Sequence, residues 1–163
     1  MVYGKEKIIS AAGLSSLRQR YPGKRIVFTN GCFDLLHVGH IRSLRYAAQQ
    51  GDVLVVGLNS DASVRRLKGA DRPVIKQEDR AEMLAALDFV DHIVIFDEDT
   101  PYSLVERLRP DVLVKGGDWR EEQLAEAKFA GKFIPAPYYS GRSTGEIIQR
   151  IRGTKDNLKG ERT

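Results

Sequence analysis

Short, continuously apolar segments are the feature that most constrains the fold of this chain. The segment Asp52–Leu58 (DVLVVGL) shows no alternation of polar and apolar residues, as expected of a strand buried on both faces of a parallel sheet. Comparable segments recur, separated by stretches with the apolar spacing of helices. Strands are predicted at Arg25–Thr29, Asp52–Leu58, Asp91–Phe96, Asp111–Lys115 and Lys132–Pro135.

Helices are predicted between these strands and at both ends of the series, at residues 8–20, 38–50, 60–67, 77–88, 101–108, 121–130 and 143 to about 151. Regular alternation of strands and helices is typical of an α/β fold. We therefore expect a Rossmann-like three-layer sandwich with a central parallel sheet of about five strands. Ligands of such sheets bind at the carboxyl ends of the strands.

Length and composition indicate one globular domain. The 163 residues are 42% hydrophobic and 29% charged, which excludes a disordered chain. We assign residues 1–152 to the domain and 153–163 to a polar C-terminal tail. The single cysteine fits a reducing compartment, and no apolar run reaches the roughly 20 residues of a membrane span or forms a secretory signal. We expect a cytoplasmic protein without a membrane partner.

The net charge of +4 is spread along the chain rather than gathered in a basic tail. A basic balance can indicate nucleic acid binding, but small anionic substrates explain it equally well. We therefore expect no nucleic acid partner.

The stretch Phe28–Leu44 (FTNGCFDLLHVGHIRSL) carries the strongest chemical signal. It ends a predicted strand, turns at Asn30-Gly31 and continues into a helix, and the backbone N–H groups at such a helix start can face an anion. His37 and His40 lie three residues apart, so both imidazoles can donate to one phosphate group. The ordinary alternative for such histidines is a satisfied core position. Cys32 has no motif around it that would activate a thiol.

This stretch resembles the GxFDxxHxGH signature of the nucleotidyltransferase superfamily. Each fixed position is matched, by Gly31, Phe33, Asp34, His37, Gly39 and His40. The resemblance implies transfer of a nucleoside monophosphate from a triphosphate onto a phosphorylated acceptor. It implies that His37 and His40 are catalytic and bind the nucleotide. It adds nucleotide contacts from Thr29, Asn30, Gly31, Cys32 and Phe33 and a substrate contact from Asp34.

A second stretch, Gly141–Glu146, opens the last predicted helix. Ser143 and Glu146 have the spacing of a capping box, which by itself predicts only a well-formed helix start. The stretch also looks like the second signature of the superfamily, which binds the β- and γ-phosphates. Arg142, Ser143 and Thr144 are then nucleotide-binding and catalytic. The family often has another hydroxyl where this chain has Gly145, so we do not expect that hydrogen bond here.

Two loops complete the predicted site. The run Val114–Trp119 resembles the loop that holds base and ribose, with nucleotide contacts from Lys115, Gly116, Gly117 and Asp118; alone, it is an ordinary tight turn. The basic loop Lys68–Lys76 has little periodicity, and we expect it to be mobile. By resemblance to related enzymes, Lys68 is catalytic, and Lys68, Arg72 and Arg80 contact substrate phosphates. The alternative is solvated surface charge.

The sequence looks most like the adenylyltransferase domain of bifunctional heptose kinase/adenylyltransferases, over about residues 5–152. The resemblance rests on the runs FTNGCFDLLHVGH, LNSDASVRRLKG, LVKGGDW and GRST. It implies ATP and D-glycero-β-D-manno-heptose 1-phosphate as substrates, ADP-heptose as product, Mg²⁺ as cofactor and a homo-oligomer, a dimer or larger. No protein residue is assigned as a metal ligand, because Mg²⁺ keeps waters and substrate oxygens.

Two alternatives remain open at this level. Glycerol-3-phosphate cytidylyltransferase shares the FDLLHxGH run and a similar tryptophan loop, and the choice between ATP and CTP depends on backbone edges that a sequence does not display. An HxGH sequence also occurs in class I aminoacyl-tRNA synthetases, so an RNA-binding or nucleotide-sensing module is the alternative of another class.

Overall fold

The computed structural model describes residues 4–117, 119–137 and 143–160, the last stretch as backbone alone from residue 154. Its centre is a five-stranded parallel sheet in the order β3-β2-β1-β4-β5. The strands are β1 (Ile26–Gly31), β2 (Val53–Asn59), β3 (His92–Phe96), β4 (Val112–Gly116) and β5 (Lys132–Ala136). The predicted α/β class and strand number are confirmed.

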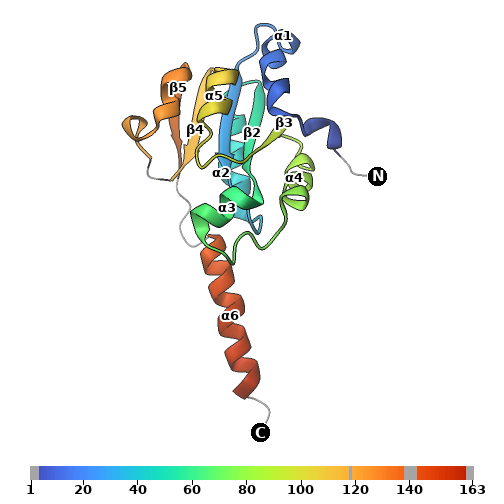
Figure 1. Cartoon of the computed structure of the whole chain (residues 1–163), viewed down its shortest axis with the longest axis vertical. Helices are drawn as coiled ribbons and strands as arrows, with labels where there is room; N and C mark the ends of the chain where they lie inside the picture. The colour runs from blue at the N-terminus through green and yellow to red at the C-terminus, as the bar shows by residue number, and fades with distance from the viewer. Residues whose placement is uncertain (1–3, 118, 138–142, 161–163) are drawn as a thin grey trace.

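Alternate strand residues face two separate cores, which makes the molecule a three-layer sandwich (Figure 1). Val27 of β1 packs in one core, while Ile26 and Phe28 pack in the other. Helices α2 (Val38–Ala48) and α4 (Gln77–Ala85) cover the first face. The opposite face is covered by η2 (Ala11–Ser16), α1 (Leu17–Arg20), α5 (Tyr102–Leu108) and η4 (Ala125–Phe129). The strands read as continuous apolar runs because both of their faces are buried.

Two predicted helices take another form. Residues 8–20 form the 3₁₀ helix η2 followed by the short α1, and residues 121–130 form the 3₁₀ helices η3 (Glu121–Gln123) and η4. Leu124 separates η3 from η4 with an extended backbone, and both Leu124 and Ala127 are buried against the sheet. Packing of these two side chains therefore overrides the helical pattern.

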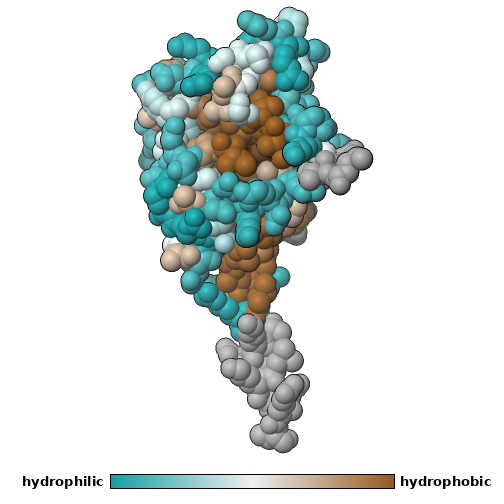
Figure 2. Space-filling model, turned by 45° about the vertical axis from the view of Figure 1, so that its right-hand side comes forward, coloured by the Kyte–Doolittle hydropathy of each residue, from teal (hydrophilic) through white to brown (hydrophobic). Residues whose placement is uncertain are grey.

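The last helix, α6 (Thr144–Gly160), projects from the body of the molecule and continues through residues that we assigned to a polar tail (Figure 1). Figure 2 shows hydrophobic side chains on the part of α6 nearest the body. Ile147 and Ile148 are partly exposed there, and Ile151 is 54% exposed. Among the described residues, no helix is both long and apolar enough to cross a membrane.

The strand order reverses direction at β1, which pairs with β2 on one side and β4 on the other. The crevice at such a switch point is the usual ligand site of an open parallel sheet. The turn that follows β1 lies at this position, and α3 (Asp61–Lys68) begins after the neighbouring strand β2.

Candidate active site

The histidine turn, residues 32–40, forms where β1 ends. We expected the chain to turn at Asn30-Gly31, but β1 continues through Gly31 and pairs it with Leu58 of β2. The turn begins at Cys32 instead and includes two non-glycine residues with left-handed backbone, Phe33 (φ 46°) and Leu35 (φ 52°). Left-handed conformations are costly for such residues and persist where surrounding contacts hold them.

His37 and His40 lie against each other at the start of α2. Their rings stack with centroids 3.8 Å apart, and the edge of Phe33 packs on His40 at 5.3 Å. His37 is the N-cap of α2, and its Nδ1 accepts a hydrogen bond from the Gly39 N–H at 3.1 Å. An accepting Nδ1 carries no proton, so the neutral His37 ring is protonated at Nε2.

Both rings are held in the neutral form. Burial lowers the pKa of His37, opposed by the nearby Glu146 carboxylate. Burial, helped by the charge of His37, lowers the pKa of His40 to about 4. The His40 Nδ1 is buried and has no hydrogen-bond partner among the described residues. The two imidazoles therefore act as neutral donors rather than as cations at pH 7.

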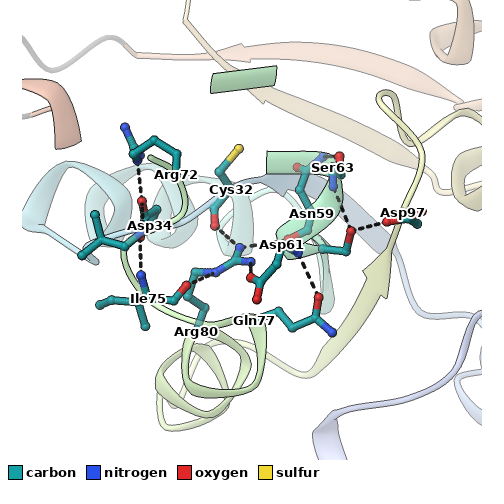
Figure 3. A network of polar contacts seen from close by, with 12 residues as sticks. Cys32, Asp34, Asn59, Asp61, Ser63, Arg72, Ile75, Gln77, Arg80 and Asp97 are labelled. Atoms are coloured by element: carbon teal, nitrogen blue, oxygen red, sulfur yellow. Dashed lines mark hydrogen bonds and ion pairs between the residues drawn. The ribbon is translucent and has the colours of Figure 1, made fainter. Parts of the chain in front are cut away.

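Asp34 lies inside the histidine turn and binds the basic loop. Its carboxylate accepts hydrogen bonds from the N–H groups of Val74 and Ile75 at 2.9 to 3.0 Å. It also pairs with the Arg72 Nε at 2.6 Å (Figure 3). Burial raises the pKa of Asp34, but these three donors outweigh it and lower that pKa overall. Residues 72–75 are thus anchored, against the expectation of a freely mobile loop.

The substrate contact that we expected from Asp34 does not fit this placement, because its carboxylate is fully buried and already accepts internal bonds. Arg72 is only partly used, since its Nε alone is engaged with Asp34. The Arg72 side chain is 17% exposed, so a substrate contact from Arg72 stays a prediction.

Arg80 is also internal, and the substrate contact that we expected from it needs correction. The side chain is 0% exposed although it begins on the first turns of α4. It donates to the carbonyls of Ile75, Cys32 and Asn59 at 2.5 to 2.9 Å and pairs with Asp61 at 2.7 Å (Figure 3). Arg80 therefore ties the ends of β1 and β2 to the loop before α4.

The start of α6 lies against the histidine turn. The predicted capping box is present, because the Ser143 N–H donates to Glu146 at 2.7 Å and the Glu146 N–H donates to the Ser143 hydroxyl at 3.2 Å. The Thr144 hydroxyl donates to the backbone carbonyl of Asp34 at 2.7 Å. The Ser143 hydroxyl acts as an acceptor in the capping box, so its proton is available to a ligand. The Thr144 hydroxyl, by contrast, already donates its proton to Asp34. Arg142 lies outside the described residues.

Lys115 connects the ends of β1 and β4. Its Nζ donates to Asn30 Oδ1 at 3.0 Å, lies 3.7 Å from the buried Glu126 carboxylate, and faces the Trp119 ring at 5.4 Å. Burial lowers the pKa of Lys115, and the Glu126 carboxylate opposes that shift. Gly117 has φ 97°, which glycine adopts without strain. Asp118 lies outside the described residues.

The remaining predicted residues differ in exposure. Thr29 is buried within β1, and Lys68 is exposed at the end of α3. Burial raises the pKa of the Cys32 thiol, and the charge of Lys68 is the first to oppose that shift. Among the described residues, no group of three histidine, cysteine or carboxylate side chains could hold a metal ion.

Comparison with known proteins decides the family. Residues 28–150 match the cytidylyltransferase-like family model. The chain belongs to the cytidylyltransferase-like family. The superfamily that the Gly31–His40 signature indicated is thereby confirmed, and with it a nucleotidyltransferase enzyme.

Curated relatives of this cytidylyltransferase-like chain are longer proteins. It is 53% identical over 152 residues to the bifunctional protein HldE of Geotalea uraniireducens, covering 91% of this chain and 31% of that protein. It is 55% identical over 137 residues to the bifunctional protein HldE of Geobacter sulfurreducens, covering 82% and 28%. The chain therefore spans about a third of the length of the curated relatives that it matches.

Solved structures agree with the family fold. The lipopolysaccharide core biosynthesis protein from Thermoplasma volcanium matches with a TM-score of 0.63 and 25% identity, over 72% of this chain and 100% of that one. The pantoate-beta-alanine ligase of Francisella tularensis matches in fold, with a TM-score of 0.55 and 18% identity over 80% of this chain and 66% of that one.

In this cytidylyltransferase-like chain, the predicted residues fall into two groups. One gathers around the histidine turn with His37, His40, Ser143 and Thr144, and the other lies at the end of β4 with Lys115 and Asn30. Sequence reasoning missed Glu126, because no local pattern marks a buried carboxylate in a 3₁₀ segment. Trp119 entered the sequence analysis only as the last residue of the run Val114–Trp119, without a role of its own.

Proposed function

We propose that the chain transfers an adenylyl group from ATP to D-glycero-β-D-manno-heptose 1-phosphate, giving ADP-heptose and pyrophosphate for the lipopolysaccharide core. The observation that carries the chemistry is the stacked pair of neutral imidazoles, His37 and His40, beside the capped start of α6. The choice of heptose rests on the 53–55% identity to bifunctional HldE proteins. Residues 1–152 form the transferase domain.

In the proposed reaction, a phosphate oxygen of the sugar 1-phosphate attacks the α-phosphorus of ATP. A bond forms from that oxygen to phosphorus, the bond from the α-phosphorus to the bridging oxygen breaks, and pyrophosphate leaves with the electron pair. The acceptor phosphate is already ionised, so no general base is required. The protein acts by positioning the two substrates and by stabilising negative charge.

His37 and His40 donate their Nε2–H groups to the α- and β-phosphate oxygens, where charge grows in the transition state. Both rings are neutral beforehand: the Gly39 N–H bond to Nδ1 leaves the His37 proton on Nε2, and we assign the His40 proton to Nε2 as well. The hydroxyl of Ser143 and the N–H groups at the start of α6 bind the leaving pyrophosphate, together with Arg142. Lys68, exposed at the end of α3, closes on the phosphates.

Magnesium enters this reaction with the nucleotide. The described residues offer no cluster of carboxylates for it, and Asp34 accepts only internal bonds. Mg²⁺ prefers phosphate oxygens and waters, so it would be held by the nucleotide and would supply neutralisation of phosphate charge.

Adenine and ribose bind at the end of β4, between Asn30 and the loop that ends at Trp119. Gly116 and Gly117 let the backbone approach a planar ring, and Lys115 holds Asn30 and Trp119 in place. We place the reaction in the cytoplasm, without a nucleic acid or membrane partner, and we expect a dimer or larger assembly.

The deciding experiment is pyrophosphate release with Mg²⁺ in a grid of ATP or CTP against heptose 1-phosphate or glycerol 3-phosphate. Release only with ATP and the heptose phosphate supports the proposal. Release with CTP and glycerol 3-phosphate keeps the mechanism and overturns the substrates. If folded protein releases no pyrophosphate with any substrate pair and binds RNA in a salt-sensitive way, the result favours an RNA-binding module instead.

A further inference from the structure

Asp34 is hydrogen-bonded both to the basic loop and to the start of α6. Its side chain, fully buried, accepts from Arg72, Val74 and Ile75. Its backbone carbonyl accepts from the Thr144 hydroxyl at 2.7 Å. The histidine turn, the basic loop and α6 are far apart in sequence, since Asp34 and Thr144 are separated by 110 residues. These are also the three segments to which the phosphate contacts are assigned.

The backbone around Asp34 needs such contacts. Phe33 and Leu35, its two neighbours, both have left-handed φ angles, and conformations of this kind cost on the order of 1 kcal/mol or more each. Partners on the side chain and on the carbonyl of Asp34 hold the turn from two sides. His37 follows this turn directly, so the placement of the imidazoles depends on it.

A second link joins α6 to the basic loop, which contains Asp71. The ion pair between Arg152 and Asp71 is 4.0 Å long, and both side chains are largely exposed. Exposed pairs contribute little in water. The Thr144 bond, at the first residue of α6 and half-buried, links α6 directly to the histidine turn.

We propose that Asp34 is a positioning residue that couples the basic loop and the start of α6 to the histidine turn, so that the phosphate-binding groups of all three segments adopt one arrangement. The inference rests on the proposed function for its catalytic consequence, but the coupling itself is a property of the free protein. Asp34 acts through its neighbours and touches no substrate.

The coupling is tested by amide hydrogen exchange on the full chain, without ligand. Thr144→Val removes the hydroxyl at nearly constant shape, and Thr144→Ser keeps it. We expect Thr144→Val to speed exchange of the Val74 and Ile75 amides by about tenfold, the loss expected of one hydrogen bond, although Thr144 contacts neither residue. Thr144→Ser should exchange as the wild type does. Unchanged exchange at Val74 and Ile75 in Thr144→Val overturns the inference.

The reverse direction uses Asp34→Asn, whose amide group places N–H donors against the N–H groups of the basic loop. We expect faster exchange in the first turn of α6. Asp111→Asn is the matched control, because Asp111 also binds an arginine and a backbone N–H, from Arg18 and Ile26, at the opposite ends of the strands. An equal effect on α6 from Asp111→Asn overturns the coupling. If Asp34→Asn does not fold, Arg72→Gln takes its place.

The second test of the coupling measures turnover. If Asp34 and Thr144 act as one unit, Asp34→Asn and Thr144→Val each lower kcat, and the double variant is no slower than the slower single variant. If the fold-losses in kcat of the two single variants multiply in the double variant, the coupling in catalysis is overturned. If the wild type releases no pyrophosphate with any substrate pair, the proposed function fails, while the exchange results still decide the inference.

Discussion

His40 is packed against two aromatic rings, with one of its ring nitrogens buried. Its Nδ1 is buried without a partner among the described residues, the face of His37 covers it on one side, and Phe33 meets it edge-on. The two neighbouring rings fix the plane of the neutral imidazole. The packing therefore prepares the donor before any nucleotide binds.

Replacing His40 with alanine should remove several powers of ten from turnover, because a donor to the developing charge is lost from a preorganised site, where a single donor is worth about a hundredfold to a thousandfold. The fold should survive, since the His40 Nδ1 makes no hydrogen bond in the described structure. Pyrophosphate release and the thermal midpoint measure the two effects. Near wild-type turnover would contradict the role, and His92→Gln, at the amino end of β3, is the control for loss of a buried imidazole.

Arg80 should matter for stability rather than for substrate affinity. Arg80→Leu leaves the carbonyls of Cys32 and Asn59 and the Asp61 carboxylate without their donor, and breaking a buried pair costs about 3–5 kcal/mol. Urea unfolding measures this loss. Arg66→Leu is the matched control, because Arg66 pairs with Asp99 on the surface and should cost about 1 kcal/mol or less. Equal costs for the two variants would show that Arg80 is not a structural centre.

The roles of Asp34 and Arg80 show where sequence reasoning fails at this scale. A signature marks Asp34 as special, but its partners lie 38 to 41 residues further along the chain. Arg80 bonds to residues 5 to 48 positions away. No local pattern tells a buried, internally paired charge from an exposed one, so both were assigned to substrate.

At the scale of elements, the strands were predictable because burial on both faces leaves a continuous apolar run. Asp52–Leu58 was expected as a strand, and β2 is Val53–Asn59. The 121–130 segment was not predictable, since its 3₁₀ form follows from packing of Leu124 and Ala127 on the sheet rather than from local spacing. The capping box at Ser143 was predictable, because both of its partners lie within one helical turn.

The capping box yields a prediction for α6 as an element. Glu146→Ala removes the acceptor of the Ser143 N–H and should weaken the helix start by about 1 kcal/mol. Because the same turn binds phosphate in the proposed reaction, the KM for ATP should rise about fivefold, the factor that 1 kcal/mol represents. Steady-state kinetics measure this change. Glu146→Gln keeps an acceptor and should behave as the wild type; equal KM values in all three proteins would contradict the argument.

At the scale of the whole molecule, the fold buries each of the three histidines enough to lower its pKa, mainly through loss of solvent. His37 and His40 lie at the carboxyl ends of the strands, and His92 lies at the amino end of β3, hydrogen-bonded to Tyr21. A folded pKa below the unfolded value means that the unfolded chain binds more protons in the interval between the two. Unfolding then takes up protons and becomes easier as pH falls.

The stability of the free protein should therefore fall steadily as pH drops from 7 to 5. With the folded pKa of His40 at about 4 and the unfolded value near 6.5, His40 alone lowers the free energy of unfolding by about 2 kcal/mol at pH 5. The pKa values of Asp34 and Asp111 are lowered from 3.8, so the stability that these carboxylates contribute is lost only at still lower pH and leaves this interval unaffected. Urea unfolding at pH 7, 6 and 5 measures the slope, which His40→Gln should flatten by removing the largest shift. A wild-type free energy that stays constant from pH 7 to 5 would mean that the histidines are not held neutral, and with it the donor chemistry proposed for His37 and His40 would lose its physical basis.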